Sequence, residues 1–527
     1  MNKKLMLQSL KRTGFVLFIF IAFIATAMFI ISPLAMNALV QQVGYITVLD
    51  IIIVLTVIIA GHLVNAVSVF LRTKLTRNFF VKAVSKIYDN VFRITYDRYI
   101  DEGPSALQSR INESVSAYAG FYFDTVPSII TNSFVVAATV IIVFTINPFI
   151  AIAMLATLPL SYIGYKILNK RLSFLSIEMN KICSEAWANE NALISQVDFI
   201  KQNSQNHLLL PFVERFKFDH QEITRKVNNT AMGWSMLMDG INKFINHVII
   251  LVLAFMMLND ITAVGGAIFI MLILPYFTSA VAGLRSVNLG MAGVVAANEF
   301  FDEITKNTAP SGQLTIDKID QITFDIDKVA VKDKVLLKNV RLKAKKGDII
   351  GIMGQSGYGK STLVKLLMKF RPCSGIYVDK VPISDINTTG YLNLVSYYSQ
   401  NTPIVTDTLY NNLNFGRVPV SRDVYRNLEF LTKFKNLDEK ILENGANLSA
   451  GDRQRIALAR VFTEDAQVIV LDEPTSSLDK ETEVEILASI LDACKDKIVF
   501  LISHNVENLK QCSQMYKIKS GRLEKVR

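Results

Sequence analysis

The sequence predicts two domains of different fold class: an all-α membrane domain with six spanning helices, followed by an α/β domain with a largely parallel sheet. The chain has 527 residues, which is too long for one compact domain at about 100–200 residues per domain. Hydrophobic residues make up 51% of the chain and charged residues only 19%, and the mean hydropathy is +0.32. Soluble proteins of this size seldom contain so much apolar sequence, so membrane-spanning segments are expected.

Six apolar segments are long enough to cross a bilayer, for which about 20 residues are needed. They cover residues 14–40, 45–71, 126–146, 149–168, 244–258 and 264–281. The first is longer than the apolar region of a secretory signal peptide, so it indicates a membrane helix and not a cleaved leader. The fifth is the weakest, because Asn246 and His247 interrupt its start.

Basic residues lie in every second link between these segments. The amino end and the stretches after the second, fourth and sixth segments contain Lys or Arg, whereas the short links after the first, third and fifth contain none. Basic flanks stay on the cytoplasmic side, so the alternation predicts a multi-pass protein with both termini in the cytoplasm. Frequent Lys, Asn and Ile favour a bacterial plasma membrane. These flanks also explain the net charge of +10, so no nucleic acid partner is expected.

Two long polar stretches separate the second segment from the third and the fourth from the fifth. They cover residues 72–125 and 169–242, contain few helix breakers and show apolar residues at helical spacing. This pattern predicts that the membrane helices continue far into the cytoplasm. The alternative is a pair of small cytoplasmic domains between the helices.

The character of the sequence changes at Ala309, after which Pro310, Ser311 and Gly312 indicate a linker. Beyond the linker, short β-rich runs alternate with helical stretches, which is typical of an α/β domain. Runs 349–353 and 468–471 have the composition of buried strands. We therefore predict a transmembrane domain over residues 1–308 and an α/β domain over residues 309–527.

A glycine-rich motif of the form GxxxxGK[ST] follows the first of these strands. It consists of Gly354, Gln355, Ser356, Gly357, Tyr358, Gly359, Lys360, Ser361 and Thr362. Glycines let backbone N–H groups curl around phosphate oxygens, and the N-terminus of a following helix favours an anion. The motif predicts a nucleotide site with Lys360 on the β- and γ-phosphates and the Ser361 hydroxyl on Mg²⁺.

Two acids follow the second strand directly. Asp472 is in the position of an aspartate that faces the metal ion of a bound nucleotide, and Glu473 can act as general base on an attacking water. The alternative is a strand that ends in two solvated acids, which the nearby phosphate-binding motif disfavours.

A third motif shows a resemblance to ATP-binding-cassette (ABC) proteins. It is similar to their LSGGQ signature, lies shortly before the Asp-Glu strand, and consists of Leu448, Ser449, Ala450, Gly451 and Asp452. Asp479 resembles the aspartate of the family's D-loop, His504 its switch histidine, and Gln400 its Q-loop glutamine. Residues 443–445 resemble the loop before the signature in exporters.

The membrane half carries a similar resemblance. Residues 96–99 and 107–112 resemble the first intracellular loop of ABC exporters, residues 185–191 and 197–201 the second, and residues 296–302 the exit from the sixth helix. The chain is therefore identified as a member of the exporter-type ABC half-transporters, in which a transmembrane domain is fused to a P-loop ATPase domain.

The resemblance implies ATP and Mg²⁺ as cofactors and a head-to-tail dimer of ATPase domains. Ser449 and Gly451 would contact the γ-phosphate of ATP bound to the partner. Glu473, His504 and Gln400 would serve hydrolysis, and the metal ion would be held by Ser361, Gln400 and Asp472. One chain has one ATPase domain, so the resemblance implies either a homodimer or a heterodimer with a second half-transporter.

Two departures from the family pattern concern the strength of the site. Asp452 replaces the common signature Gln and Ala450 replaces a Gly, although the serine remains. The stretch 328–332 contains no aromatic residue where the family places its adenine-stacking side chain. Loss of one stacking contact would cost about 1–3 kcal/mol, by analogy with nucleobase stacking.

Together these features predict an ATP-hydrolysis-driven exporter of an amphipathic or hydrophobic substrate, such as a peptide, a lipid or a drug. The alternative is an ATP-gated or regulatory ABC membrane protein that transports nothing. The presence of Lys360, Asp472, Glu473 and His504 favours the exporter, because a regulator can lose such groups. Polar residues within the spans, such as His62 and His247, would either line a cavity or join helices by hydrogen bonds.

Overall fold

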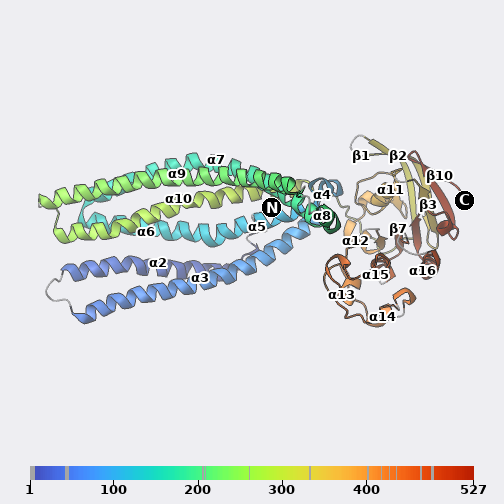
Figure 1. The fold of residues 1–527 in the computed structure, drawn as a ribbon, viewed down its shortest axis with the longest axis horizontal. Helices are drawn as coiled ribbons and strands as arrows, with labels where there is room; N and C mark the ends of the chain where they lie inside the picture. Colours follow the sequence, from blue (N-terminus) through green and yellow to red (C-terminus); the bar gives the residue numbers. More distant parts are fainter. Residues whose placement is uncertain are drawn as a thin grey trace. The chain divides into compact units, whose positions relative to one another are not determined.

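The computed structural model describes most of the chain as two compact units, Met1–Thr308 (the first unit) and Ala309–Arg527 (the second unit). The described residues are 6, 8–41, 47–203, 207, 209–259, 262–331, 334–355, 357–399, 403–416, 418–426, 428–431, 433–434, 436–462, 466–475 and 480–527. Figure 1 shows helices alone in the first unit and a sheet with helices in the second. The two fold classes are those predicted.

Long helices make up the first unit. They are α2 (Arg12–Gln41), α3 (Val48–Val91), α6 (Val126–Ile146), α7 (Pro148–Ile194), α9 (Leu210–Leu258) and α10 (Val264–Lys306). Shorter elements are α4 (Tyr96–Glu102), α5 (Pro104–Gly120), the π-helix η1 (Phe121–Thr125) and α8 (Val197–Asn203). Six candidate membrane spans are present by length and composition among the described residues. The prediction of six spans is confirmed.

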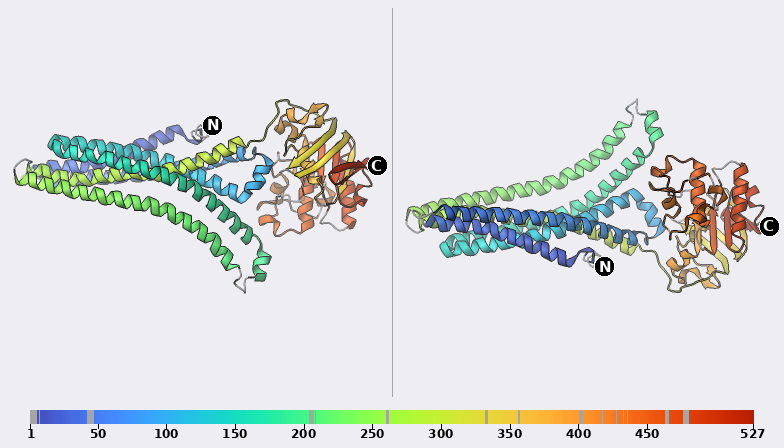
Figure 2. Two further views of the ribbon diagram at one scale, coloured as in Figure 1. Left: turned by 90° about the horizontal axis from the view of Figure 1, so that it is seen from above. Right: turned by 90° about the horizontal axis from the view of Figure 1, so that it is seen from below.

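The polar stretches between the spans are helical in the structure. α3 has 44 residues, α7 has 47 and α9 has 49, which is about twice the length a bilayer requires. Figure 2 shows α7 and α9 running side by side and curving away from the other helices towards α8. The described parts of residues 72–125 and 169–242 therefore extend the membrane helices and do not form separate small domains.

Local sequence explains where these helices begin. The side chain of Asn147 caps α7 by accepting a hydrogen bond from the Ile150 N–H at 3.2 Å, and Pro148 occupies the first turn, where no N–H partner is lost. Gly103, with φ of 80°, separates α4 from α5, and Pro104 begins the second of these helices.

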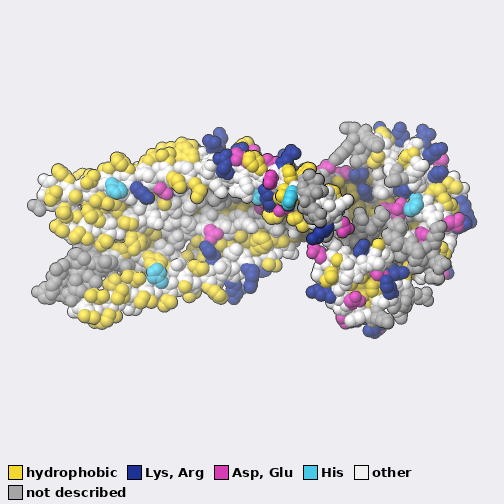
Figure 3. All heavy atoms as spheres, in the orientation of Figure 1, with side chains coloured by type: hydrophobic (Ala, Val, Ile, Leu, Met, Phe, Trp, Pro, Cys, Tyr) yellow, Lys and Arg dark blue, Asp and Glu magenta, His cyan; other side chains and the backbone are white. Residues whose placement is uncertain are grey.

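The surface of the first unit is rich in exposed apolar side chains, as Figure 3 shows on one face. On α3, for example, Leu55, Ile59 and Leu63 are exposed. A soluble surface would not leave such a stripe uncovered, whereas contact with lipid accounts for it. Among the polar residues of the spans, His62 packs edge-on against Phe29, and His247 bonds within its own helix to the Lys243 carbonyl.

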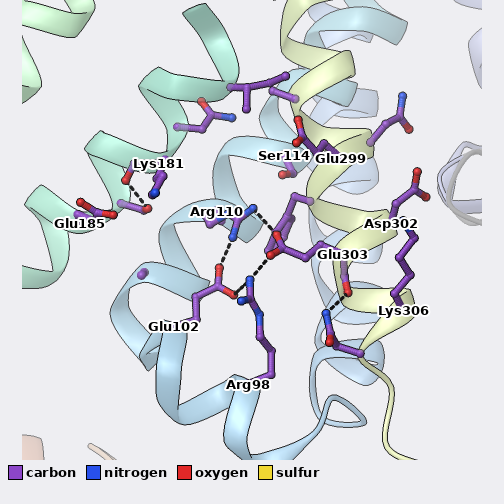
Figure 4. Close-up of a pocket in the computed structure, with 18 of the residues that line it drawn as sticks. Arg98, Glu102, Arg110, Ser114, Lys181, Glu185, Glu299, Asp302, Glu303 and Lys306 are labelled. Carbon is purple, nitrogen blue, oxygen red and sulfur yellow. Dashed lines mark hydrogen bonds and ion pairs between the residues drawn. The ribbon is translucent and has the colours of Figure 1, made fainter. Parts of the chain in front are cut away.

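One end of the first unit contains a partly buried cluster of ion pairs (Figure 4). Arg98 and Arg110 each bind both Glu102 and Glu303, so that α4, α5 and α10 are tied together. The guanidinium of Arg110 also lies 4.4 Å from the ring centroid of Phe300. A cleft of about 910 Å³ opens beside the cluster and is lined in part by α7.

The second unit is built on a sheet whose order is β5-β4-β1-β2-β10-β9-β3-β8-β7-β6 in the described residues. The strands are β1 (Gln321–Val331), β2 (Lys334–Lys345), β3 (Ile349–Gly354), β4 (Ile376–Val378), β5 (Val381–Pro382), β6 (Val395–Tyr398), β7 (Val468–Asp472), β8 (Ile498–Ile502), β9 (Gln514–Lys519) and β10 (Arg522–Lys525). The helices are α11 (Lys360–Leu367), α12 (Thr388–Asn393), α13 (Leu409–Leu413), α14 (Arg422–Arg426), α15 (Ala450–Phe462) and α16 (Lys480–Ala493), with 3₁₀ turns η3 (Ile383–Asp385), η4 (Glu429–Leu431), η5 (Glu443–Gly445) and η6 (Glu507–Leu509).

The sheet is less parallel than the sequence suggested. The strands from β9 through β3, β8 and β7 to β6 run parallel, but β1 pairs antiparallel with β2 and β4, and β9 pairs antiparallel with β10. The antiparallel pair β9–β10 is joined by a tight turn in which Ser520 and Gly521 both have positive φ. Short connections of this kind reverse the chain without a crossover helix.

Both faces of the central strands are buried. In β7, Val468 and Val470 pack with α11 on one face, whereas Ile469 and Leu471 pack with α15 and α16 on the other. Alternate residues of a strand point to opposite faces, so an uninterrupted apolar run indicates a strand covered on both sides. This arrangement leaves the carboxyl ends of the central strands available for polar residues.

We predict that Arg110→Ala lowers the stability of the first unit by about 1–3 kcal/mol, because Glu102 and Glu303 lose a partly buried partner. The matched control is Arg93→Ala, which removes an exposed pair with Asp89 and should cost about 0–0.5 kcal/mol. Thermal unfolding in detergent measures both. Equal shifts for the two variants would contradict a structural role for the cluster.

Candidate nucleotide-binding site

The glycine-rich motif forms the loop between β3 and α11. Gly357 and Gly359 have φ of 82° and 105°, a region that side chains with a Cβ rarely adopt. A Cβ on Gly359 would also lie 2.8 Å from Cδ2 of Leu337, and one on Gly354 would lie 2.9 Å from the carbonyl oxygen of Ile518. The glycines therefore let the backbone turn tightly at the end of β3, which is the geometry a phosphate requires.

Lys360 begins α11 and lies behind this loop. Its side chain is buried and donates a hydrogen bond to the carbonyl oxygen of Gly354, at the start of the motif. Ser361 is exposed and Thr362 is buried. The first N–H groups of a helix have no partner within the helix, so this end of α11 attracts an anion.

Asp472 ends β7 and lies level with the phosphate loop. In the parallel register Asp472 is opposite Ile502 of β8, and Ile502 is opposite Ile352 of β3. Burial raises the pKa of Asp472, and the neighbouring Glu473 adds to the effect, whereas the positive charges of Lys360 and Lys365 oppose it. Without a cation, the ionised carboxylate of Asp472 is poorly solvated. A cation bound at this edge would therefore stabilise its charged form.

Glu473 follows in an uncommon backbone conformation. Its φ is 51°, and its N–H donates to the carbonyl oxygen of Ile502 at 3.0 Å. Its Oε1 lies 3.6 Å from Nδ1 of His504, which follows β8. Strained conformations of this kind cluster at functional sites because the surrounding structure must hold them. The strands thus bring together the acid and the histidine that the sequence placed 31 positions apart (504 − 473).

A buried hydrogen-bond network supports this edge, and the sequence analysis did not find it. Glu483 of α16 accepts hydrogen bonds from the Thr475 hydroxyl and from the Asn508 side-chain amide, both at 2.6 Å. Thr475 and Asn508 are themselves buried. The network joins the segment after Glu473 to η6. A lone Thr, Glu or Asn carries no sequence signal for such a role.

The signature-like residues form the start of α15. Asp452 donates its backbone N–H to Oγ of Ser449 at 3.1 Å, and the Ser449 hydroxyl donates to Oδ2 of Asp452 at 2.7 Å. The backbone N–H of Ser449 also points to this carboxylate, at 3.3 Å. This is a capping box, in which a serine and an acid three residues later satisfy each other's backbone N–H groups. Asp452 therefore has a defined structural role.

Two cations balance the charge of Asp452. Nζ of Lys433 lies 2.9 and 3.0 Å from its two oxygens, and Nη1 of Arg455 lies 3.1 Å from one of them. Burial tends to raise the pKa of Asp452, but the hydrogen bonds from Lys433 and Ser449 outweigh it and lower that pKa. Lys433 was missed in the sequence because it lies 19 positions before Asp452, outside any motif.

Some predicted site residues lie outside the described part of the chain: Ser356, Gln400 and Asp479. The others fall into two groups. The phosphate loop, Asp472, Glu473 and His504 share the edge at the ends of β3, β7 and β8, whereas Leu448, Ser449, Ala450, Gly451 and Asp452 lie at the start of α15. The two groups begin helices that pack on opposite faces of the sheet, α11 on one and α15 on the other.

The donor set of the first group fits a nucleotide with Mg²⁺. The glycine loop offers backbone N–H groups, and the Ser361 hydroxyl and Asp472 carboxylate are the hard oxygen ligands that this ion prefers. The described residues contain no group of three or more His, Cys, Asp or Glu side chains that could hold a metal ion alone. Oxygen atoms of the nucleotide would have to complete the coordination, which is usual for Mg²⁺.

Comparisons with known proteins agree with this site. The family model described as ABC transporter matches residues 337–476. A probable ABC transporter ATP-binding/permease protein of Haemophilus influenzae is 36% identical over 220 residues, which are 40% of this chain and 40% of that protein. An ATP-dependent lipid A-core flippase of Legionella pneumophila is 24% identical over 494 residues, covering 90% of this chain and 83% of the relative.

The fold of the whole chain also has a solved counterpart. The structure of a bacterial Atm1-family ABC exporter with ATP bound superposes with a TM-score of 0.79 at 16% identity, over 97% of this chain and 93% of that chain. The sequence matches thus indicate an ABC-type ATPase domain, and the fold of the whole chain resembles that of an ABC exporter. The second unit thus carries an ABC transporter ATPase domain, and the chain as a whole is similar to exporter-type ABC half-transporters, in which a transmembrane domain is fused to an ATP-binding cassette.

Proposed function

We propose that this protein is an ATP-hydrolysis-driven exporter that moves an amphipathic or hydrophobic substrate across a plasma membrane. The observation that carries the proposal is the edge where the phosphate loop, Asp472, Glu473 and His504 meet, in a chain that also has six membrane-length helices. A regulator that only binds ATP has no need of a general base beside a histidine. The substrate class extends to peptides, lipids and drugs, and the flippase relatives support its lipophilic character.

The chemistry proposed is transfer of the γ-phosphoryl group to water. Lys360 and the loop N–H groups hold the phosphates. Glu473 accepts a proton from the attacking water, and His504 orients the γ-phosphate. Mg²⁺, bound with ATP by Ser361, Asp472 and Gln400, would neutralise phosphate charge. Gln400 and Asp479 keep the roles that the family resemblance implies for them.

We propose that a dimer completes each site. The phosphate loop and Ser449 begin helices on opposite faces of the sheet, and the family resemblance implies that Ser449 of one chain meets a nucleotide on another copy or on a related chain. In the structure the Ser449 hydroxyl is engaged by Asp452, and it would turn to the γ-phosphate when the dimer closes. Lys433 and Arg455 then offset the negative charge that Asp452 brings near the phosphate. Homodimers and heterodimers satisfy this requirement equally.

The proposed location is a bacterial plasma membrane with both chain termini in the cytoplasm. The support is the alternation of basic and non-basic links between the six candidate spans. In this orientation the ATPase domain reaches cytoplasmic ATP, and the extended parts of α3, α7, α9 and α10 lie on the same side.

We predict that Glu473→Gln lowers the ATPase rate of the purified chain in lipid nanodiscs by about 100-fold or more, while ATP binding remains. The amide keeps the size of the side chain but cannot accept the proton. Glu507→Gln, an exposed position paired with Lys510, is the control and should hydrolyse ATP normally. Absence of turnover in the unaltered chain, with ATP bound, would contradict a self-sufficient homodimer and favour either a heterodimer or the regulatory alternative.

A second prediction concerns pH. The folded-state pKa of Asp472 is raised by burial and by Glu473, so its ionisation costs stability as the pH rises through that pKa. Without nucleotide, Asp472→Asn should therefore melt higher than the unaltered chain, by a margin that grows from about pH 4 towards neutrality. Asp438→Asn should do the opposite, because hydrogen bonds from Arg422 lower the pKa of Asp438. A pH-independent difference would refute this account of Asp472.

The capping role of Asp452 gives a third prediction. Asp452→Ala removes the acid of the capping box and leaves Lys433 and Arg455 without it, so we expect a loss of about 1–2 kcal/mol. Asp452→Gln keeps a capping acceptor and should lose less than about 1 kcal/mol. Thermal unfolding of both variants measures this. If Asp452→Gln lost as much stability as Asp452→Ala, the negative charge of Asp452, and not its capping hydrogen bonds, would be its stabilising contribution.

A further inference from the structure

Glu473 and His504 lie on different loops, and their close approach has to be held from outside. Glu473 has a φ of 51°, a region that residues with a Cβ seldom adopt, and its N–H donates to the carbonyl oxygen of Ile502 at 3.0 Å. The His504 side chain is 68% exposed, so packing does not fix it. The distance of 3.6 Å between Oε1 of Glu473 and Nδ1 of His504 therefore depends on how the two loops are anchored.

The loop that follows Glu473 is anchored through Thr475. This side chain is buried, and its hydroxyl donates to Oε1 of Glu483, in the first turn of α16, at 2.6 Å. A hydroxyl that donates to a carboxylate forms a short and strong hydrogen bond. Only Pro474 separates Thr475 from Glu473, so a shift of the Thr475 backbone would move the catalytic acid as well.

The loop that carries His504 is anchored to the same oxygen atom. Asn508 is buried, and its side-chain amide donates to Oε1 of Glu483 at 2.6 Å. That amide also lies 3.5 Å from Oγ of Ser503, and this oxygen accepts the backbone N–H of Asn505 at 3.0 Å. Because Ser503 and Asn505 directly flank His504, these contacts hold the backbone on both sides of the histidine.

Glu483 is thus an acceptor shared by two loops. The amide nitrogen of Asn508 lies 3.3 Å from the Thr475 hydroxyl, so the three side chains contact one another. Buried hydroxyl and amide groups need partners, and the members of a buried network strengthen one another. Without the Glu483 oxygen, Thr475 and Asn508 would each lose their shortest side-chain hydrogen bond, and the two loops would no longer be joined.

The network and the phosphate-binding loop are supported from different sides. α16 packs through Ile486 and Leu487 on one face of the sheet, whereas α11, which begins at Lys360, packs on the other face. Loss of the Glu483 acceptor should therefore displace Glu473 and His504 while the groups that hold the phosphates stay in place.

We propose that Glu483 is a positioning residue for ATP hydrolysis, which sets the separation of Glu473 and His504 through Thr475 and Asn508. The inference deepens the hydrolysis proposed for this site and rests on it. A general base acts only within hydrogen-bond reach of the attacking water, and a misplacement of about 1 Å can reduce a rate about 100-fold. The alternative is a network that contributes to stability alone.

The first test measures kcat and KM for ATP in the full chain in lipid nanodiscs. Glu483→Ala should lower kcat about 10- to 100-fold and change KM less than about twofold, because only the hydrolytic groups move. Glu483→Gln keeps an oxygen that can accept from both donors, so its kcat should stay within about threefold of the unaltered chain. Thr475→Val removes one of the two hydrogen bonds and should lower kcat about tenfold, and it replaces Glu483→Ala if that variant does not fold.

The matched control is Asn414→Ala. The amide oxygen of Asn414 also accepts two hydrogen bonds, from the Val420 N–H at 3.0 Å and from the Tyr425 hydroxyl at 2.9 Å, but it contacts neither loop of the network. This variant should lower the melting temperature about as much as Glu483→Ala and leave kcat unchanged. A loss of stability alone would affect kcat equally in the two variants.

A second readout requires no hydrolysis. Glu473→Cys and His504→Cys are combined in a Cys373→Ser background, since the other three native cysteines are buried. A short bis-methanethiosulfonate reagent should join the new pair within one chain, and mass spectrometry of the digested protein detects the product. Adding Glu483→Ala should slow this cross-linking several-fold, whereas adding Asn414→Ala should not change it.

Equal kcat values for Glu483→Ala and Asn414→Ala, or unchanged cross-linking after Glu483→Ala, would overturn the proposal and leave the network a purely structural role. A loss of kcat in Glu483→Gln as large as in Glu483→Ala would also overturn it, because the acceptor oxygen would then not be the cause. If the unaltered chain binds ATP without hydrolysing it, the proposed function fails, and the cross-linking rates still decide whether Glu483 holds the two loops together.

Discussion

Parallel hydrogen bonding joins β3 to β8 and β8 to β7, and this pairing determines where the chemistry of the second unit lies. Parallel strands all end at the same edge, so the phosphate loop, Asp472 and His504 meet there although they are far apart in the chain. Shifting β7 by one residue against β8 would turn Asp472 away from this edge and would turn its apolar neighbours to the wrong faces. The alternating burial of Val468 to Leu471 holds that register in place.

The first unit obeys a different constraint. Lipid offers no hydrogen bonds, so backbone groups must be satisfied within helices, and charged side chains must be paired or lie beyond the hydrocarbon. The structure follows this rule with helices of more than 40 residues and an ion-pair cluster of Arg98, Arg110, Glu102 and Glu303 at their extended ends. Arg285 also follows this rule through its ion pair with Asp239, although its Nε has no hydrogen-bond acceptor.

The signature region shows how a departure from a family pattern can be accommodated. An acid at position 452 would repel phosphate if it stood alone. Here it caps α15 and lies between Lys433 and Arg455, so its charge is compensated before any nucleotide arrives. The effect of Asp452 therefore depends on its surroundings, in which its charge is paired and its side chain caps the helix.

The sequence by itself determined the features that depend on local patterns. Twenty or so apolar residues in a row make a membrane helix wherever they occur, and the glycines, Lys360 and Ser361 of the phosphate loop act through consecutive residues. Asp472 and Glu473 were found because they follow an apolar strand directly. Family order, and not geometry, identified His504 and the signature.

Only the tertiary structure decided the features that depend on residues distant in the chain. The antiparallel pairing of β1 with β2 and β4, the contact of Lys433 with Asp452, and the network of Thr475, Glu483 and Asn508 leave no local pattern. The same holds for Arg285. Helix packing places the acceptors for its terminal nitrogens on α9 and leaves its Nε without one. These contacts join residues that are distant in the sequence. A sequence pattern contains only the residues that are neighbours along the chain, so it cannot predict them.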